Sequence, residues 1–172
     1  SWGPPHAPYH TAPESYKKLY ANKAITLRKN VPEAQRAEAL KDYRGYYAHM
    51  TAIDDCVGEL MQTLAETGLA ENTIVVYTSD HGDMMHSRGA MKKQQPWDES
   101  LRVPFLLRWP ARLRNRPRSI AMPLDTPDIT PTLLGLVQAP VPREMEGIDR
   151  SAIVLGKVAP DTDHAALITC PS

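Results

Sequence analysis

The chain has 172 residues and a formal net charge of zero, because twenty basic side chains balance twenty acidic ones. A balanced chain has no general electrostatic attraction to nucleic acid or to an anionic membrane surface, so we expect neither as a partner. No apolar run is long enough to span a bilayer. Two cysteines, Cys56 and Cys170, form no disulfide framework and match no zinc spacing. The cellular compartment therefore stays open, and periplasmic, secreted or lysosomal export all agree with the sequence.

A proline-rich loop through Tyr9 leads into a polar stretch that we expect to be mostly helical from about residue 13 to residue 28. Asn30 then offers an N-cap, and Pro32 stands just inside a new helix, at a position where a missing N–H costs nothing. From about residue 42 to residue 66 the apolar residues follow the spacing of one helical face. These residues are Tyr46, Met50, Ile53, Val57, Leu60, Met61 and Leu64.

After that helix, the β-branched run Thr73–Thr78 predicts a strand that is buried on both faces. A second strand is expected at about Val103–Arg108. A short helix follows at about Pro127–Val137, with Thr126 as a candidate cap, and a last strand begins near Ala165. A helix followed by a strand is half of a crossover unit, and the sixteen prolines mark loops that wrap a sheet. The order of the elements is therefore typical of an α/β domain.

An Asp-His pair followed by glycine stands just beyond the predicted strand Thr73–Thr78. Open α/β sheets bind ligands in the crevice at the carboxyl ends of their strands, so we expect chemistry at Asp80 and His81. A carboxylate oxygen and an imidazole nitrogen together provide half of a divalent-cation shell. Gly82 lets the backbone turn away without a side chain in the approach. By itself, this tripeptide is more typical of an ordinary turn at the end of a strand.

The stretch from His81 to Pro110 resembles the C-terminal signature of the sulfatase family, which belongs to the alkaline-phosphatase-like superfamily. In that family a strand ends in Ser-Asp-His-Gly or Ser-Asp-Asn-Gly, a lysine follows about a dozen residues later, and an Arg-x-Pro segment leads into another strand. Here Lys93 stands thirteen residues after Asp80 and eleven before Pro104. This is the register of the family's sulfate-contacting lysine, and the neighbouring Lys92 is the less favoured candidate.

Other segments resemble the same family, so the likeness covers almost the whole chain. The opening Pro5-His6-Ala7-Pro8-Tyr9 resembles a Pro-His-x-Pro-Tyr turn, in which His6 would contact the substrate. Residues 46–64 resemble the long helix that precedes the Asp-His strand, and residues 128–136 and 145–149 resemble the segments after it. The resemblance implies an alkaline-phosphatase/sulfatase-like α/β fold, with a mixed, mainly parallel sheet flanked by helices.

Two features of the family are missing from the chain. Sulfatases carry in their N-terminal portion a Cys-x-Pro-Ser-Arg or Ser-x-Pro-Ser-Arg motif, whose first residue becomes the formylglycine nucleophile, and an Asp-Asp pair that completes the metal shell. Cys170-Pro171-Ser172 lacks the intervening residue and the arginine. Asp54 and Asp55 are expected in the middle of a helix, where adjacent side chains point about 100° apart and cannot share an ion. We therefore expect residues 1–172 to be one partial domain, the C-terminal portion of a catalytic domain, whose partner is the missing N-terminal portion of the same domain.

The resemblance also implies a role for each site residue. Asp80 and His81 would hold a divalent cation, which by resemblance is calcium (Ca²⁺), close to the formylglycine of the absent portion. Lys93 would bind a sulfate oxygen as a point charge. His6, when protonated, would donate a hydrogen bond to the bridging oxygen and help the alcohol to leave. Arg88 is a weaker candidate for contact with the group that bears the sulfate, as is the neighbouring His86, and a surface role fits both equally well.

Three functions agree with these residues. The first is a sulfatase that cleaves a sulfate ester of a small molecule or a glycan. The second is a phosphonate monoester hydrolase or phosphodiesterase of the same superfamily, which by resemblance shares the Asp-His pair and the lysine. The third is a non-catalytic relative that serves as a binding module. Only the two enzymes need the nucleophile motif in a preceding segment.

Overall fold

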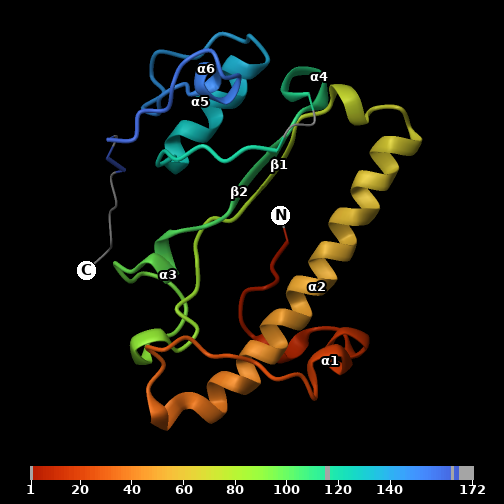
Figure 1. Ribbon diagram of the computed structural model, residues 1–172, viewed down its shortest axis with the longest axis vertical. Coiled ribbons are helices and arrows are strands. Elements are labelled where there is room, and N and C mark those ends of the chain that lie inside the picture. The colour runs from red at the N-terminus through yellow and green to blue at the C-terminus, as the bar shows by residue number, and fades with distance from the viewer. Residues whose placement is uncertain (1, 115–116, 164, 167–172) are drawn as a thin grey trace. The chain divides into compact units, whose positions relative to one another are not determined.

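We describe the fold from a computed structural model, which describes residues 2–114, 117–163 and 165–166 (Figure 1). The chain divides into two compact units. The first consists of Ser1–Ala70 and Tyr77–Leu106, and the second of Glu71–Val76 and Leu107–Ser172. No helix among the described residues has the length and apolar character needed to cross a membrane.

The first unit begins with a short helix, α1 (Glu14–Tyr20), which packs against the long helix α2 (Arg36–Glu66). The helix predicted from residue 13 to residue 28 is therefore too long. The chain beyond α1 is a non-helical loop instead, which buries Leu27 and Val31 in a cluster with Tyr9, Ala39, Tyr43 and Met85. The hydrophobic gain of that cluster outweighs the weak helical preference of the polar stretch.

Helix α2 begins at Arg36, after a 3-10 turn at Glu33–Gln35. This is before the apolar stripe predicted from about residue 42 and a few residues after the start predicted at Pro32. The predicted N-cap at Asn30 is wrong, because its side chain donates a hydrogen bond to Glu99 Oε1 at 2.8 Å. The buried face of α2 lies mainly in its N-terminal half and comprises Ala39, Tyr43, Gly45, Ala48, His49 and Ile53. Leu60 belongs to the predicted apolar stripe, but it is 54% exposed.

Gly45 lets the opening segment of the chain lie directly on α2. A Cβ atom at this position would collide with the backbone carbonyl oxygen of Tyr9. Tyr9 begins the 3-10 turn Tyr9–Thr11 and is buried against the helix. The missing side chain therefore fixes where the Pro-His-x-Pro-Tyr turn docks.

Strands β1 (Val75–Thr78) and β2 (Phe105–Arg108) pair in a two-stranded sheet. They run in opposite directions in Figure 1, and the N–H of Gly82 donates to the carbonyl of Ser100 at 2.8 Å just beyond them. Each strand is two residues shorter at its start than predicted. Within the described ranges these are the only strands, so the described residues do not include the mainly parallel part of the expected sheet. The strand predicted from Ala165 falls almost wholly outside the described residues.

The described part of the second unit contains the α-helices α4 (Pro110–Leu113), α5 (Thr126–Leu136) and α6 (Ser151–Val154). Thr126 is the first residue of α5 and not its cap, since the N-cap position is Asp125. The buried Asp128 on α5 accepts a hydrogen bond from the N–H of Ile148 at 2.8 Å and pairs with Arg150 Nε at 3.4 Å. The segment after α5 is thus pinned to it by buried, satisfied polar groups.

Candidate active site

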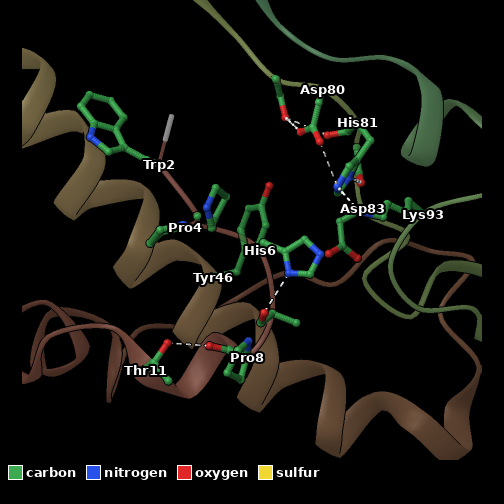
Figure 2. Close-up of a pocket in the computed structure, with 15 residues that line it drawn as sticks. Trp2, Pro4, His6, Pro8, Thr11, Tyr46, Asp80, His81, Asp83 and Lys93 are labelled. Atoms are coloured by element: carbon green, nitrogen blue, oxygen red, sulfur yellow. Dashed lines mark hydrogen bonds and ion pairs between the residues drawn. The ribbon is translucent and has the colours of Figure 1, made fainter.

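A cavity of about 480 Å³ lies in the first unit, where three segments of the chain meet (Figure 2). The opening loop lines it through residues 2–8 and Thr11, helix α2 contributes Tyr46, and the tip of β1 contributes residues 79–83. Lys93, from the loop beyond, completes the lining. The structure therefore brings together four of the six candidate residues, which are His6, Asp80, His81 and Lys93.

His81 uses its two ring nitrogens differently. Nδ1 lies 2.7 Å from the carbonyl oxygen of Gly82, which can only accept, so Nδ1 carries the hydrogen. In the neutral ring Nε2 therefore bears the lone pair, and it accepts a hydrogen bond from the Lys93 ammonium at 2.9 Å. The same nitrogen lies 3.6 Å from Asp80 Oδ2. The lone pair that would bind a metal thus faces a cation and a carboxylate.

Asp80 is the most accessible charged group of the site. Its side chain is 85% exposed, whereas that of His81 is 21% exposed. The Ser79 hydroxyl donates to the carbonyl of His81 at 2.8 Å and fixes the strand tip between them. An exposed carboxylate beside an imidazole lone pair fits two ligands of a divalent cation. Among the described residues no cluster of three or more His, Cys, Asp or Glu side chains could hold a metal, so this pair is at most half of a shell.

His6 stands across the cavity from the strand tip. Its ring lies edge-on to the His81 ring, with 5.6 Å between the centroids and 75° between the planes. Nδ1 donates to the carbonyl oxygen of Ala7 at 2.8 Å, which leaves Nε2 as the nitrogen that can gain or lose a proton. Figure 2 shows the hydroxyl end of Tyr46 rising from α2 between His6 and the Asp80 side of the cavity. Burial raises the pKa of Tyr46, so its phenol stays protonated.

Asp83 is the site residue that sequence reasoning missed. Its Oδ1 accepts hydrogen bonds from the N–H groups of Met85 at 3.0 Å and Lys92 at 3.1 Å. Its Oδ2 accepts from the Tyr9 hydroxyl at 2.7 Å. Burial, followed by this hydrogen bond, raises the pKa of Tyr9, which keeps the phenol a donor. The only signal in the sequence is an aspartate two residues after His81, typical of a turn that its own side chain closes.

The loop that carries Lys93 is unusually constrained. Five of its non-glycine residues have left-handed backbone angles, namely Met85, His86, Arg88, Lys92 and Gln94. Such residues persist only where the surroundings hold them. Arg28 is part of that support, since its Nη1 donates to the carbonyl of Met84 and to the hydroxyl of Ser87, each at 3.1 Å. No regularity of the sequence predicts these angles.

Two candidates lie away from the cavity. Arg88 is exposed, with its guanidinium 4.0 Å from the centroid of the Trp97 ring. His86 is buried, and its Nε2 lies 2.8 Å from Asp42 Oδ2. Both belong to the support of the loop, and neither lines the cavity described above.

The family model of the sulfatases matches residues 3–139, and the chain therefore belongs to the sulfatase family. It is similar to an ulvan-active sulfatase of Formosa agariphila, with 40% identity over 95% of this chain and 32% of that protein. An endo-4-O-sulfatase of Bacteroides thetaiotaomicron is 35% identical over 84% of this chain and 29% of its own length. The chain thus spans about a third of the length of the curated relatives it matches.

The fold of the chain is also similar to that of a solved structure. The crystal structure of a candidate sulfatase from Bacteroides fragilis superposes with a TM-score of 0.83 and 31% sequence identity. The likeness covers 91% of this chain and 35% of that one. This agrees with the alkaline-phosphatase-like α/β fold that the sequence indicates.

Proposed function

We propose that this chain is the C-terminal portion of a sulfatase catalytic domain and that it hydrolyses sulfate esters together with a preceding N-terminal portion. The observation that carries the proposal is the convergence of His6, Asp80, His81 and Lys93 on one cavity. His6 is far along the sequence from the other three, which are close together, and the chain belongs to the sulfatase family. The preceding portion would supply the formylglycine nucleophile and the remaining metal ligands.

The charges of the cavity suit a sulfate ester. Its non-bridging oxygens are negative, and the bridging oxygen becomes negative as the S–O bond breaks. Lys93, whose ammonium lies 2.9 Å from His81 Nε2, would bind a non-bridging oxygen. His6, protonated at Nε2, would donate to the bridging oxygen, because Nδ1 is engaged with Ala7. The two cations would thus meet the two places where negative charge lies.

Asp80 and His81 would hold the divalent cation, for which the family resemblance indicates Ca²⁺. The exposed carboxylate and the Nε2 lone pair fit an ion with oxygen and nitrogen ligands. When bound, the ion would position the sulfate and stabilise negative charge on the nucleophile. The Lys93 ammonium lies 2.9 Å from this Nε2. It would leave that lone pair to the ion and turn to the sulfate oxygen when both are bound.

The apolar part of the cavity lining favours a ring-shaped leaving group. Trp2 and Tyr46 line the cavity together with Pro4 and Pro5, and Trp2 is 52% exposed. Flat aromatic faces bury large apolar area against a ring, while a phenol hydroxyl offers a polar contact. A sulfated sugar of a glycan has both an apolar ring face and hydroxyl groups. The names of the two curated relatives described above agree with a glycan substrate.

The test of this proposal uses the protein in which the chain is joined to its N-terminal portion. Hydrolysis rates are measured on an aryl sulfate and on an aryl phosphonate monoester. Lys93→Ala should lower turnover of the sulfate by about 10² or more, the order expected for one preorganised charge-stabilising group. Lys92→Ala is the matched control and should be nearly silent, since that side chain is exposed and does not line the cavity.

Each other outcome points to a different account. Equal effects at both lysines, or a larger effect at Lys92, would show that the assigned register is off by one residue. Faster hydrolysis of the phosphonate would favour a phosphonate monoester hydrolase. Binding of the sulfate ester without hydrolysis of either substrate would favour a non-catalytic binding module.

A further inference from the structure

We infer that Asp83 is a positioning residue of this site, which holds Lys93 and His6 in place around His81. The inference rests on the proposed function, because it assigns how that function's residues are fixed. Asp83 lies two residues beyond His81, and its carboxylate connects three segments of the first unit. It is a positioning residue because its oxygens are engaged by groups of the protein.

The first connection holds the loop that carries Lys93. Asp83 Oδ1 accepts from the N–H groups of Met85 and Lys92, which stand at the two ends of the loop. Both donors are left-handed residues, with φ of 45° and 63°. The N–H of Met84 also donates to the carbonyl of Lys92 at 2.7 Å. The carboxylate thus ties together the strained ends of the loop directly beside Lys93.

The second connection holds the turn that carries His6. Asp83 Oδ2 accepts from the hydroxyl of Tyr9, three residues beyond His6, at 2.7 Å. Tyr9 is 3% exposed and packs in the hydrophobic cluster of the first unit. Its ring is therefore a rigid support that reaches from the cluster to the strand tip. Figure 2 shows Asp83 between His6 and Lys93, the two groups that it would hold.

A carboxylate is suited to this position and not to substrate contact. Three donors engage its two oxygens, and charge-assisted hydrogen bonds of this kind are stronger than neutral ones. Its negative charge would repel a sulfate anion that came close. Asp83 therefore acts on the substrate through Lys93 and His6. Displacing these groups by about 1 Å would lower turnover on the order of 10².

The experiment compares Asp83→Ala with Asp83→Asn in the joined protein, with Asp54→Ala as the control. Asp83→Ala removes all three hydrogen bonds and should lower kcat about 10²-fold. Asp83→Asn keeps an oxygen for the two N–H groups, and its amide N–H₂ can donate to the Tyr9 oxygen. It should therefore retain kcat within about a few-fold although the charge is gone. Asp54 is exposed on α2 away from the cavity, so its replacement should change nothing.

A double-mutant cycle separates positioning from a general loss of stability. If Asp83 acts through Lys93, Asp83→Ala should cost several-fold less in a Lys93→Ala background than in the wild-type protein. Its effect on the midpoint of thermal unfolding should be the same in both backgrounds. Tyr9→Phe, which removes only the hydroxyl, should lower kcat less than Asp83→Ala does and leave the Lys93→Ala effect unchanged.

The outcomes distinguish this inference from the proposed function. An unaltered rate in Lys93→Ala would overturn the proposed function itself. A large Lys93→Ala effect combined with a silent Asp83→Ala would overturn only the inference. The full Asp83→Ala cost persisting without Lys93, or an equal loss in Asp83→Asn, would also overturn it, since the carboxylate would then act independently or by its charge.

Discussion

At the residue scale, the site depends on which atoms of each side chain donate hydrogen bonds and which accept them. His81 offers its Nε2 lone pair to the cavity only because the carbonyl of Gly82 fixes the hydrogen on Nδ1. This second contact of an imidazole is the feature that orients a metal-binding histidine and sets its tautomer. Gly82 itself has no alternative, since a Cβ there would collide with the backbone oxygen of Glu99. His81 and Gly82 are thus each required for a different physical reason.

The metal assignment predicts distinct results for the two ligands. In the joined protein, Asp80→Ala should remove the bound divalent ion and nearly all turnover, because a hard cation depends most on its carboxylate. His81→Ala should weaken metal affinity without abolishing it. Metal analysis of the purified variants, with Asp54→Ala as the matched carboxylate control, measures both effects. An Asp80→Ala protein with stoichiometric metal and the wild-type rate would refute the assignment.

The sequence predicts the residue types of the site better than their supports. The strand tip and Lys93 follow from a local motif, since their spacing along the chain is short. The Tyr9 to Asp83 hydrogen bond joins residues 74 positions apart, and no pattern in one sequence indicates such a pair. The five non-glycine left-handed residues around Lys93 are equally hidden, because their residue types do not indicate this conformation. Tertiary contacts determine them.

At the element scale, α2 is the frame on which the opening turn and the cavity are built. Its existence follows from apolar periodicity, and the prediction of a helix over residues 42–66 is confirmed within a longer element, Arg36–Glu66. The periodicity does not locate the start of α2. The first turns bury the small residue Ala39, which adds little to an apolar pattern, and tertiary packing is what buries it. Likewise, Leu27 and Val31 are buried in the hydrophobic cluster although their segment is not helical. Local signals therefore give the elements, and packing sets their ends.

Two glycines of α2 provide a matched test of this packing. Gly45→Ala should destabilise the protein by about 1–3 kcal/mol, because its Cβ would meet the backbone of Tyr9. Gly58→Ala should stabilise it by about 0.5–1 kcal/mol, because nothing lies within 4 Å of the added Cβ and alanine favours a helix. Urea unfolding of the two variants measures the difference. Stabilisation by both would contradict the close approach of Tyr9 to α2.

At the scale of the whole molecule, the described chain leaves apolar surface without cover. Leu106 on β2 is 64% exposed and Leu60 on α2 is 54% exposed. A two-stranded sheet leaves unpaired backbone groups along its outer edges, and two strands alone are marginally stable in water. We expect the N-terminal portion to supply the neighbouring strands and cover these side chains. Residues 1–172 alone should then aggregate, and co-expression with that portion should raise their solubility.

The measurement that tests the central claim most directly is aryl sulfate hydrolysis by residues 1–172, alone and together with the N-terminal portion. The chain alone should show no turnover, because the proposed function assigns the nucleophile and the remaining metal ligands to the N-terminal portion. Addition of the N-terminal portion should produce turnover that depends on Lys93. A monomeric, cooperatively unfolding preparation of residues 1–172 that hydrolysed the ester unaided would contradict this division of the site.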